Sequence, residues 1–105
     1  MEEHLIGRVT HYFTRLCVAG VALSDTLEAG DIVRFRGKHT DLIQRATSIQ
    51  LHHLPVRKAE AGQEVGVLVD RRVRPGDRVY RLSGPDAEAL LPREELNLHD
   101  LDLER

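Results

Sequence analysis

Apolar and polar positions alternate over short runs along most of the chain. In residues 31–36 (DIVRFR), one face is made by Val33 and Phe35, whereas the opposite face carries Arg34 and Arg36. A period of two residues is typical of a β-strand with one buried face. Comparable runs lie at 5–14, 17–23, 42–56, 64–69 and 78–82, and turn residues separate them. We therefore expect six strands and no strong helical period up to Leu82.

The run at 42–56 changes phase part of the way along. Leu42 and Ala46 hold one phase, and Ile49 and Leu51 hold the other. A strand that changes phase within one sheet needs an extra residue or a sharp bend. We expect a bulge or coil near residues 47–48, and this curvature favours a barrel over a sandwich.

A five-residue pattern occurs twice, as LEAGD at 27–31 and VRPGD at 73–77. Pro75 before Gly76 suits the two central positions of a type II turn, whose second position needs a positive φ. An Asp side chain hydrogen-bonds readily to the backbone of such a turn. We expect each copy to start a strand, with the upstream apolar residue closing one end of the core.

The last residues follow a different pattern. Pro85 and Asp86 are typical of the start of a helical turn, and Pro92 interrupts it. The leucines beyond Pro92 match neither a helical nor a strand period. We divide the chain into a β-barrel domain at 1–83 and an acidic tail at 84–105, the tail being a short docked helix or a mobile extension.

Composition narrows the class of protein. A chain of 105 residues with 4% aromatic residues builds its core from Val, Leu, Ile and Ala. One cysteine excludes an internal disulfide and fits a reducing compartment. The first residues carry acids instead of the bases and long apolar run of a signal peptide, and no run reaches membrane-spanning length. We expect a cytoplasmic protein with no membrane contact.

The net charge of −2 is unevenly distributed. Residues 84–105 contain seven acids and two arginines, which gives −5. Residues 1–83 contain 13 bases and ten acids, which gives +3. A mildly basic body is compatible with a polyanionic partner.

Four fragments in order resemble domain 2 of the translation GTPases, such as elongation factor Tu. They are IGRVTHYF, LEAGDIVRFRG, TSIQLHHLPVRKAEAGQEVGVLV and VRPGDRVYRL, within residues 5–82. The chain is similar also to standalone elongation-factor-like proteins and to the accessory barrel of collagenase-type peptidases. The resemblance implies a closed six-stranded Greek-key barrel. In the translation factors, this barrel contacts ribosomal RNA and tRNA.

The resemblance does not extend to GTP binding. The chain contains no G-x-x-x-x-G-K-[ST] segment, so we expect no GTP-dependent activity from it. The resemblance also suggests that His53 is a structural hydrogen-bonding residue near the barrel rim.

Basic side chains cluster in the 34–39 hairpin and in the RRVR segment before the last strand. Arginine presents a planar fork of donors that suits phosphate groups. The candidate RNA-binding residues are Arg15, Arg34, Arg36, Lys38, Arg71, Arg72 and Arg74. The alternative is a solvated exterior or a protein interface balanced by nearby acids.

No arrangement of residues suggests catalysis. His52 and His53 are adjacent on an expected strand, so they face opposite sides and do not share one metal ion. Cys17 lies in an apolar run and is expected to be a small buried hydrophobe. We expect no metal, no cofactor and no enzymatic activity.

Two functions remain open at this point. The first is a noncatalytic translation-factor-like module that contacts ribosomal RNA or tRNA through its basic hairpins. The second is an accessory protein-interaction domain for a separately encoded enzyme of the peptidase-associated type. An enzyme of another kind would require an acid–base pair or ligand set that the sequence does not display.

Overall fold

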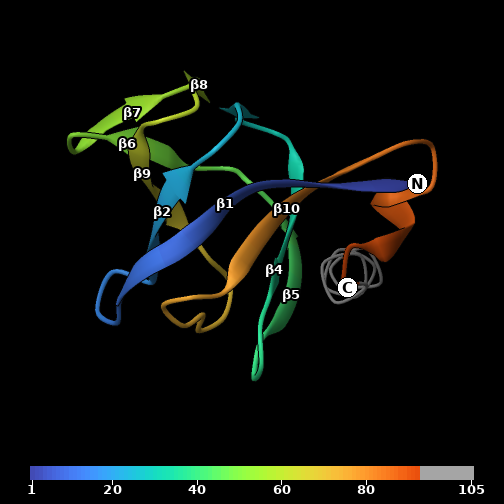
Figure 1. Ribbon diagram of the computed structural model, residues 1–105, viewed down its shortest axis with the longest axis horizontal. Helices are drawn as coiled ribbons and strands as arrows, with labels where there is room; N and C mark the ends of the chain where they lie inside the picture. The colour runs from blue at the N-terminus through green and yellow to red at the C-terminus, as the bar shows by residue number, and fades with distance from the viewer. Residues whose placement is uncertain (93–105) are drawn as a thin grey trace, which may run out of the picture.

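A computed structural model describes residues 1–92, in which the regular secondary structure is β-strand apart from one short helical turn (Figure 1). Strands β1 to β5 are Glu2–Phe13, Val18–Leu23, Leu27–Glu28, Ile32–Arg36 and Asp41–Arg45. Strands β6 to β10 are Ile49–Leu51, Leu54–Val56, Lys58–Ala59, Glu64–Leu68 and Arg78–Ser83. A 3₁₀ helix, η1, spans Ala87–Leu90. The expectation of an all-β protein is confirmed.

The strands form one large antiparallel sheet and one small one. The large sheet has eight strands in the order β5-β4-β10-β1-β2-β9-β6-β7, and β3 pairs with β8 separately. β1 is the longest strand, and it pairs with β10 along its first half and with β2 along its second. The register of β1 shifts between Leu5 and Gly7 and again between Val9 and His11. Such bulges bend a strand, so β1 curves the whole sheet.

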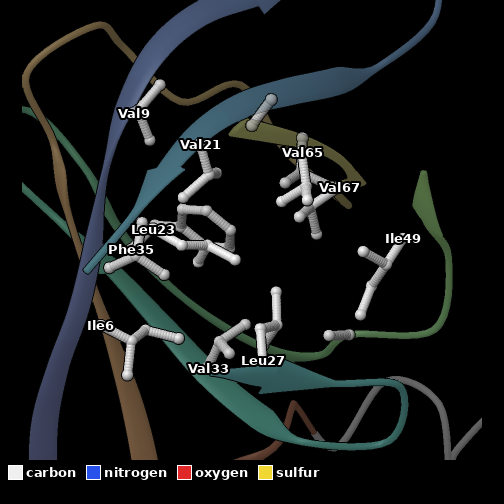
Figure 2. Close-up of a cluster of buried hydrophobic side chains, with 14 of the residues drawn as sticks. Ile6, Val9, Val21, Leu23, Leu27, Val33, Phe35, Ile49, Val65 and Val67 are labelled. Atoms are coloured by element: carbon white, nitrogen blue, oxygen red, sulfur yellow. The ribbon is translucent and has the colours of Figure 1, made fainter. Parts of the chain in front are cut away.

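The core lies on the concave side of this curved sheet (Figure 2). Alternate residues of each strand point into it, as Val65 and Val67 do in β9. The Phe35 ring is fully buried, and it lies among aliphatic side chains from several strands. A period of two therefore accounts for the core, because successive side chains of a strand point to opposite faces.

The expected closed six-stranded Greek-key barrel is wrong. The backbone ladder stays open, with β5 and β7 as its two edges. Where β5 approaches the end of β9, the buried side chain of Gln44 bridges the two segments. Its amide donates to the Leu68 carbonyl at 2.9 Å and accepts from the Asp70 N–H at 2.7 Å. One side chain makes the contacts that a neighbouring strand's backbone would otherwise make.

The run at 42–56 forms three strands instead of one. The coil expected near residues 47–48 is confirmed, since residues 46–48 separate β5 from β6. A second break was missed: His52 and His53 form the two-residue turn of the β6–β7 hairpin, in which Leu51 pairs with Leu54. Both histidines have positive φ, 53° and 67°, as the central residues of a type I′ turn do.

The two Gly-Asp segments form the same turn, as the sequence predicts. The Asp31 N–H donates to the Glu28 carbonyl, and the Asp77 N–H donates to the Arg74 carbonyl, each at 3.0 Å. Gly30 and Gly76 have φ values of 99° and 95°, a conformation in which glycine has no steric penalty. Each turn leads into a strand, β4 or β10.

Residues 84–92 cross the outer face of the sheet. Ala87 of η1 is buried against Ile32 and Leu82, and the Arg45 guanidinium lies 3.2 Å from the Glu88 carboxylate. The short helical turn expected there is confirmed, whereas the remainder of the expected acidic tail lies outside the described residues. Within residues 1–92, no helix has the length and apolar content needed to traverse a bilayer.

Candidate functional site

Arg34 lies on the outer face of β4, as its alternation predicts, and two carboxylates neutralise it. Its Nη1 lies 2.6 Å from Glu3, and its Nε and Nη2 each lie 2.8 Å from the Asp41 carboxylate. The hydrogen bonds with Asp41 and Glu3 raise the pKa of Arg34, and those with Arg34 lower the pKa of Asp41. The fork of donors expected to contact phosphate is therefore already engaged within the sheet.

Arg36 is less completely paired than Arg34. One Glu3 oxygen lies 3.4 Å from Arg36 Nη1, and the guanidinium carbon lies 4.7 Å from the centre of the Tyr80 ring. This geometry is a cation–π contact. Lys38 is exposed at the tip of the β4–β5 hairpin.

The other predicted basic residues lie on loops. Arg15 is exposed in the turn between β1 and β2. Arg71, Arg72 and Arg74 are exposed in the segment that leads from β9 to β10. Arg78 was not among the predicted residues, and the register places it directly opposite Arg36. The signal for Arg78 was available, because it precedes Tyr80 by two residues and so shares its face.

A groove of about 400 Å³, which was not predicted from the sequence, lies on the outer face of β2, β9 and β6. Gly20 of β2 and Gly66 of β9 form a cross-strand pair beneath it. Since their neighbours Ala19 and Val67 point into the core, the two glycines leave the outer face without side chains. The absence of Cβ atoms at adjacent positions hollows this part of the sheet.

Two segments form the walls of the groove. The end of β1 supplies Phe13 and the β1–β2 turn supplies Leu16, and their exposed fractions are 48% and 67%. The β6–β7 turn supplies His52 and His53. At one end, the Glu64 carboxylate accepts a hydrogen bond from the Thr10 hydroxyl. Exposed apolar side chains around a hollow are typical of a surface that binds another molecule.

The β6–β7 turn explains why His52 and His53 differ from their expected roles. The side chain of His53 makes no hydrogen bond with residues 1–92 and is exposed, so the structural role suggested for it is wrong. Non-glycine residues with positive φ cost energy, and such strain gathers at functional sites. The strained turn places both imidazoles beside the groove.

Cys17 is exposed, contrary to the expectation of a buried hydrophobe. It has a φ of 56° and ends the β1–β2 turn, where its Sγ lies 3.9 Å from the Thr14 carbonyl oxygen. The apolar run around Cys17 suggested burial, but Cys17 ends the turn that precedes the buried residues of β2. In residues 1–92, no three His, Cys, Asp or Glu side chains are placed to hold a metal ion.

Comparisons with known proteins point to peptidases. An uncharacterized protease of Methanocaldococcus jannaschii is 38% identical over 78 residues, which cover 73% of this chain and 19% of that protein. A collagenase of Porphyromonas gingivalis is 36% identical over 82 residues, covering 76% of this chain and 23% of that protein. The chain thus spans about a fifth of the curated relatives it matches. No known family profile matches it.

A solved structure has the same fold. The C-terminal domain of a Geobacillus thermoleovorans protein, named as a U32 peptidase, matches with a TM-score of 0.71 and 22% identity. The match covers 76% of this chain and 93% of that domain. This likeness concerns the fold alone.

These comparisons correct the sequence-based function. The matched proteins are a protease, a collagenase and a peptidase domain, so the assignment to translation, with ribosome, tRNA or RNA binding, is wrong. The link with the accessory barrel of collagenase-type peptidases is supported, whereas identity with domain 2 of elongation factor Tu is not. The chain is similar to a segment of these peptidases.

Proposed function

We propose that this chain is a noncatalytic accessory domain of the U32-peptidase type, which binds the catalytic part of such a peptidase. The observation that carries the proposal is its 36–38% identity to segments that make up about a fifth of much longer proteases. In those relatives, the matching segment belongs to the same chain as the rest of the protease. We therefore expect this domain to present a surface that contacts the catalytic part of such a peptidase.

The groove between the β1–β2 turn and the β6–β7 hairpin supports this proposal. It combines exposed apolar walls with a glycine floor, and it presents few charges. Protein interfaces are depleted of charge at their centre and enriched in aromatic residues. We assign the groove to a segment of the peptidase, with Phe13 and Leu16 as the central apolar contacts.

The proposal is tested with a purified U32-type peptidase from the organism that encodes this chain. Calorimetry of the two proteins measures the dissociation constant of the complex. Leu16→Asp should raise this constant at least about tenfold, because it places a carboxylate where the complex would bury an apolar side chain. Leu5→Asp is the matched control, since Leu5 is also exposed but lies outside the groove. Absence of binding, or equal weakening by both variants, would contradict the assignment.

A catalytic role is tested in the same samples. The chain alone should cleave neither gelatin nor a casein substrate, whereas the peptidase should change its rate when the chain is added. Cleavage by the chain alone, if retained after a further purification step, would contradict its noncatalytic assignment.

A further inference from the structure

A second hollow lies away from the groove, on the outer face of β4 and β10. Its volume is about 400 Å³, and it is lined by Arg36, Gly37, Gly76, Arg78 and Tyr80. The β4–β5 hairpin borders it on one side and the turn before β10 on the other. Gly76 leaves space there, since a Cβ atom at its position would meet nothing within 4 Å.

Two like charges face each other across the strands beside this hollow. Arg36 of β4 pairs directly with Arg78 of β10, and both share the face of Tyr80. Like charges in directly opposite positions destabilise a sheet. Arg36 stacks on the Tyr80 ring, and the neighbouring Arg36 and Arg78 guanidiniums lower the pKa of the Tyr80 phenol.

The acids of the described residues compensate this pair incompletely. Glu3 lies 3.4 Å from Arg36, but it is held more closely by Arg34, at 2.6 Å. Arg78 has no carboxylate within ion-pair distance among residues 1–92. The hollow therefore presents two converging guanidiniums and one phenol to solvent.

We propose that this hollow is a binding site for a peptide carboxylate, held between the guanidiniums of Arg36 and Arg78 beside the Tyr80 ring. Arginine pairs bind carboxylates through parallel N–H···O hydrogen bonds, and a bound anion removes the repulsion between the two arginines. This site lies over other strands than the groove, and it does not depend on the proposed peptidase partner.

The surroundings favour a singly charged ligand over a phosphate. Besides Glu3, the Asp77 carboxylate lies next to the hollow, since its Oδ1 is 1.9 Å from where a Cβ on Gly37 would be. A second negative charge on the ligand would be repelled by both acids. A side-chain carboxylate can reach the hollow from either of two polypeptides. One is this chain, which carries acidic residues beyond Pro92, such as Asp100, Asp102 and Glu104, and the other is an acidic segment of another protein.

The test uses the full-length ¹⁵N-labelled chain and the peptide acetyl-Leu-Asp-Leu-Glu-amide. The Nε–Hε signals of Arg36 and Arg78 should shift on titration, and acetyl-Leu-Asn-Leu-Gln-amide should leave them unchanged. Arg36→Gln and Arg78→Gln should each raise the dissociation constant at least about tenfold, because each removes one charged donor. Arg57→Gln is the matched control, since Arg57 is exposed and lies outside the hollow.

A tail variant separates the two sources. If this chain's own acids occupy the hollow, the triple variant Asp100→Asn, Asp102→Asn, Glu104→Gln should bind the added peptide several-fold more tightly than the natural chain. If the ligand comes from another protein, both forms should bind it equally. Either result supports the site.

Three results would overturn the proposal. They are unshifted arginine signals, equal shifts with the neutral peptide, and tighter binding of inorganic phosphate than of the acidic peptide. Arg78 is exposed, so Arg78→Gln keeps the test decisive even if Arg36→Gln disturbs the stack on Tyr80.

Discussion

The turn at 27–31 and the turn at 73–77 share one sequence pattern and one hydrogen-bond scheme, yet their surroundings differ. In each, the Asp Oδ2 accepts from a backbone N–H three residues earlier, at 2.8 Å in both cases. Asp31 is half-buried, whereas Asp77 is only 4% exposed, beneath the β4–β5 hairpin. The local pattern therefore fixes the shape of a turn, and the tertiary contacts decide how much stability depends on it.

Among the residues of the two turns, the aspartates should show the largest difference in their contributions to the free energy of unfolding. Asp77→Ala should lower the free energy of unfolding by about 3 kcal/mol, because it removes a buried carboxylate together with the hydrogen bond that it accepts from the Arg74 N–H. Asp31→Ala should cost about 1 kcal/mol, because water replaces its carboxylate. Urea denaturation of both variants measures the difference, and equal losses would show that burial does not separate the turns.

Substitution of Gly37 should destabilise the protein because the buried side chain of Asp77, in the turn at 73–77, packs against this glycine. A Cβ at this position would lie 1.9 Å from Asp77 Oδ1, so Gly37→Ala should cost about 2 kcal/mol through overpacking. The double variant Gly37→Ala, Asp77→Ala tests the cause. Its loss should be clearly smaller than the sum of the two single losses, and strict additivity would count against a steric contact between these positions.

The turn glycines should behave alike, since their conformations are alike. Gly30→Ala and Gly76→Ala should each cost about 1 kcal/mol, because an L-residue with positive φ is strained even where space is open. Thermal unfolding of both variants should give matching shifts of the midpoint. A difference of more than about 0.5 kcal/mol would mean that the surroundings affect even the turn backbone.

The smallest expected effect concerns the residue before each glycine. Pro75→Ala should cost about 0.5 kcal/mol, because the unfolded chain gains freedom. The reciprocal change Ala29→Pro should not stabilise the first turn, because the Ala29 N–H donates to the Arg57 carbonyl at 2.8 Å and proline has no N–H. A stabilised Ala29→Pro variant in the same urea experiment would refute this distinction.

Alternation and turn residues predicted the longer strands and the two Gly-Asp turns, but not the two-residue strands β3 and β8. These features depend on a period of two and on the φ preference of glycine, both of which are local. The β6–β7 hairpin escaped prediction because its turn is made by His52 and His53 instead of Asn or Gly. A turn built from residues with no preference for positive φ leaves little trace in a sequence.

The Gln44 bridge and the groove both depend on contacts between residues that are distant in sequence. The groove follows from the pairing of Gly20 with Gly66, and the register between β2 and β9 is not visible from either segment alone. Likewise, the sequence around Arg34 suggested a side chain free to bind phosphate. The ion pair with Glu3, from the distant strand β1, becomes evident only in the fold. Alternation placed Arg34 on the correct face, but it did not reveal which acids share that face.

The Gln44 side chain forms the junction between β5 and the end of β9, and we call this junction the seam. A backbone ladder distributes its strength over many residues, whereas here one carboxamide joins β5 to the last residue of β9 and to Asp70 just after it. Deuterium should therefore reach the Asp70 amide before it reaches the central strands, because parting at the seam breaks no ladder.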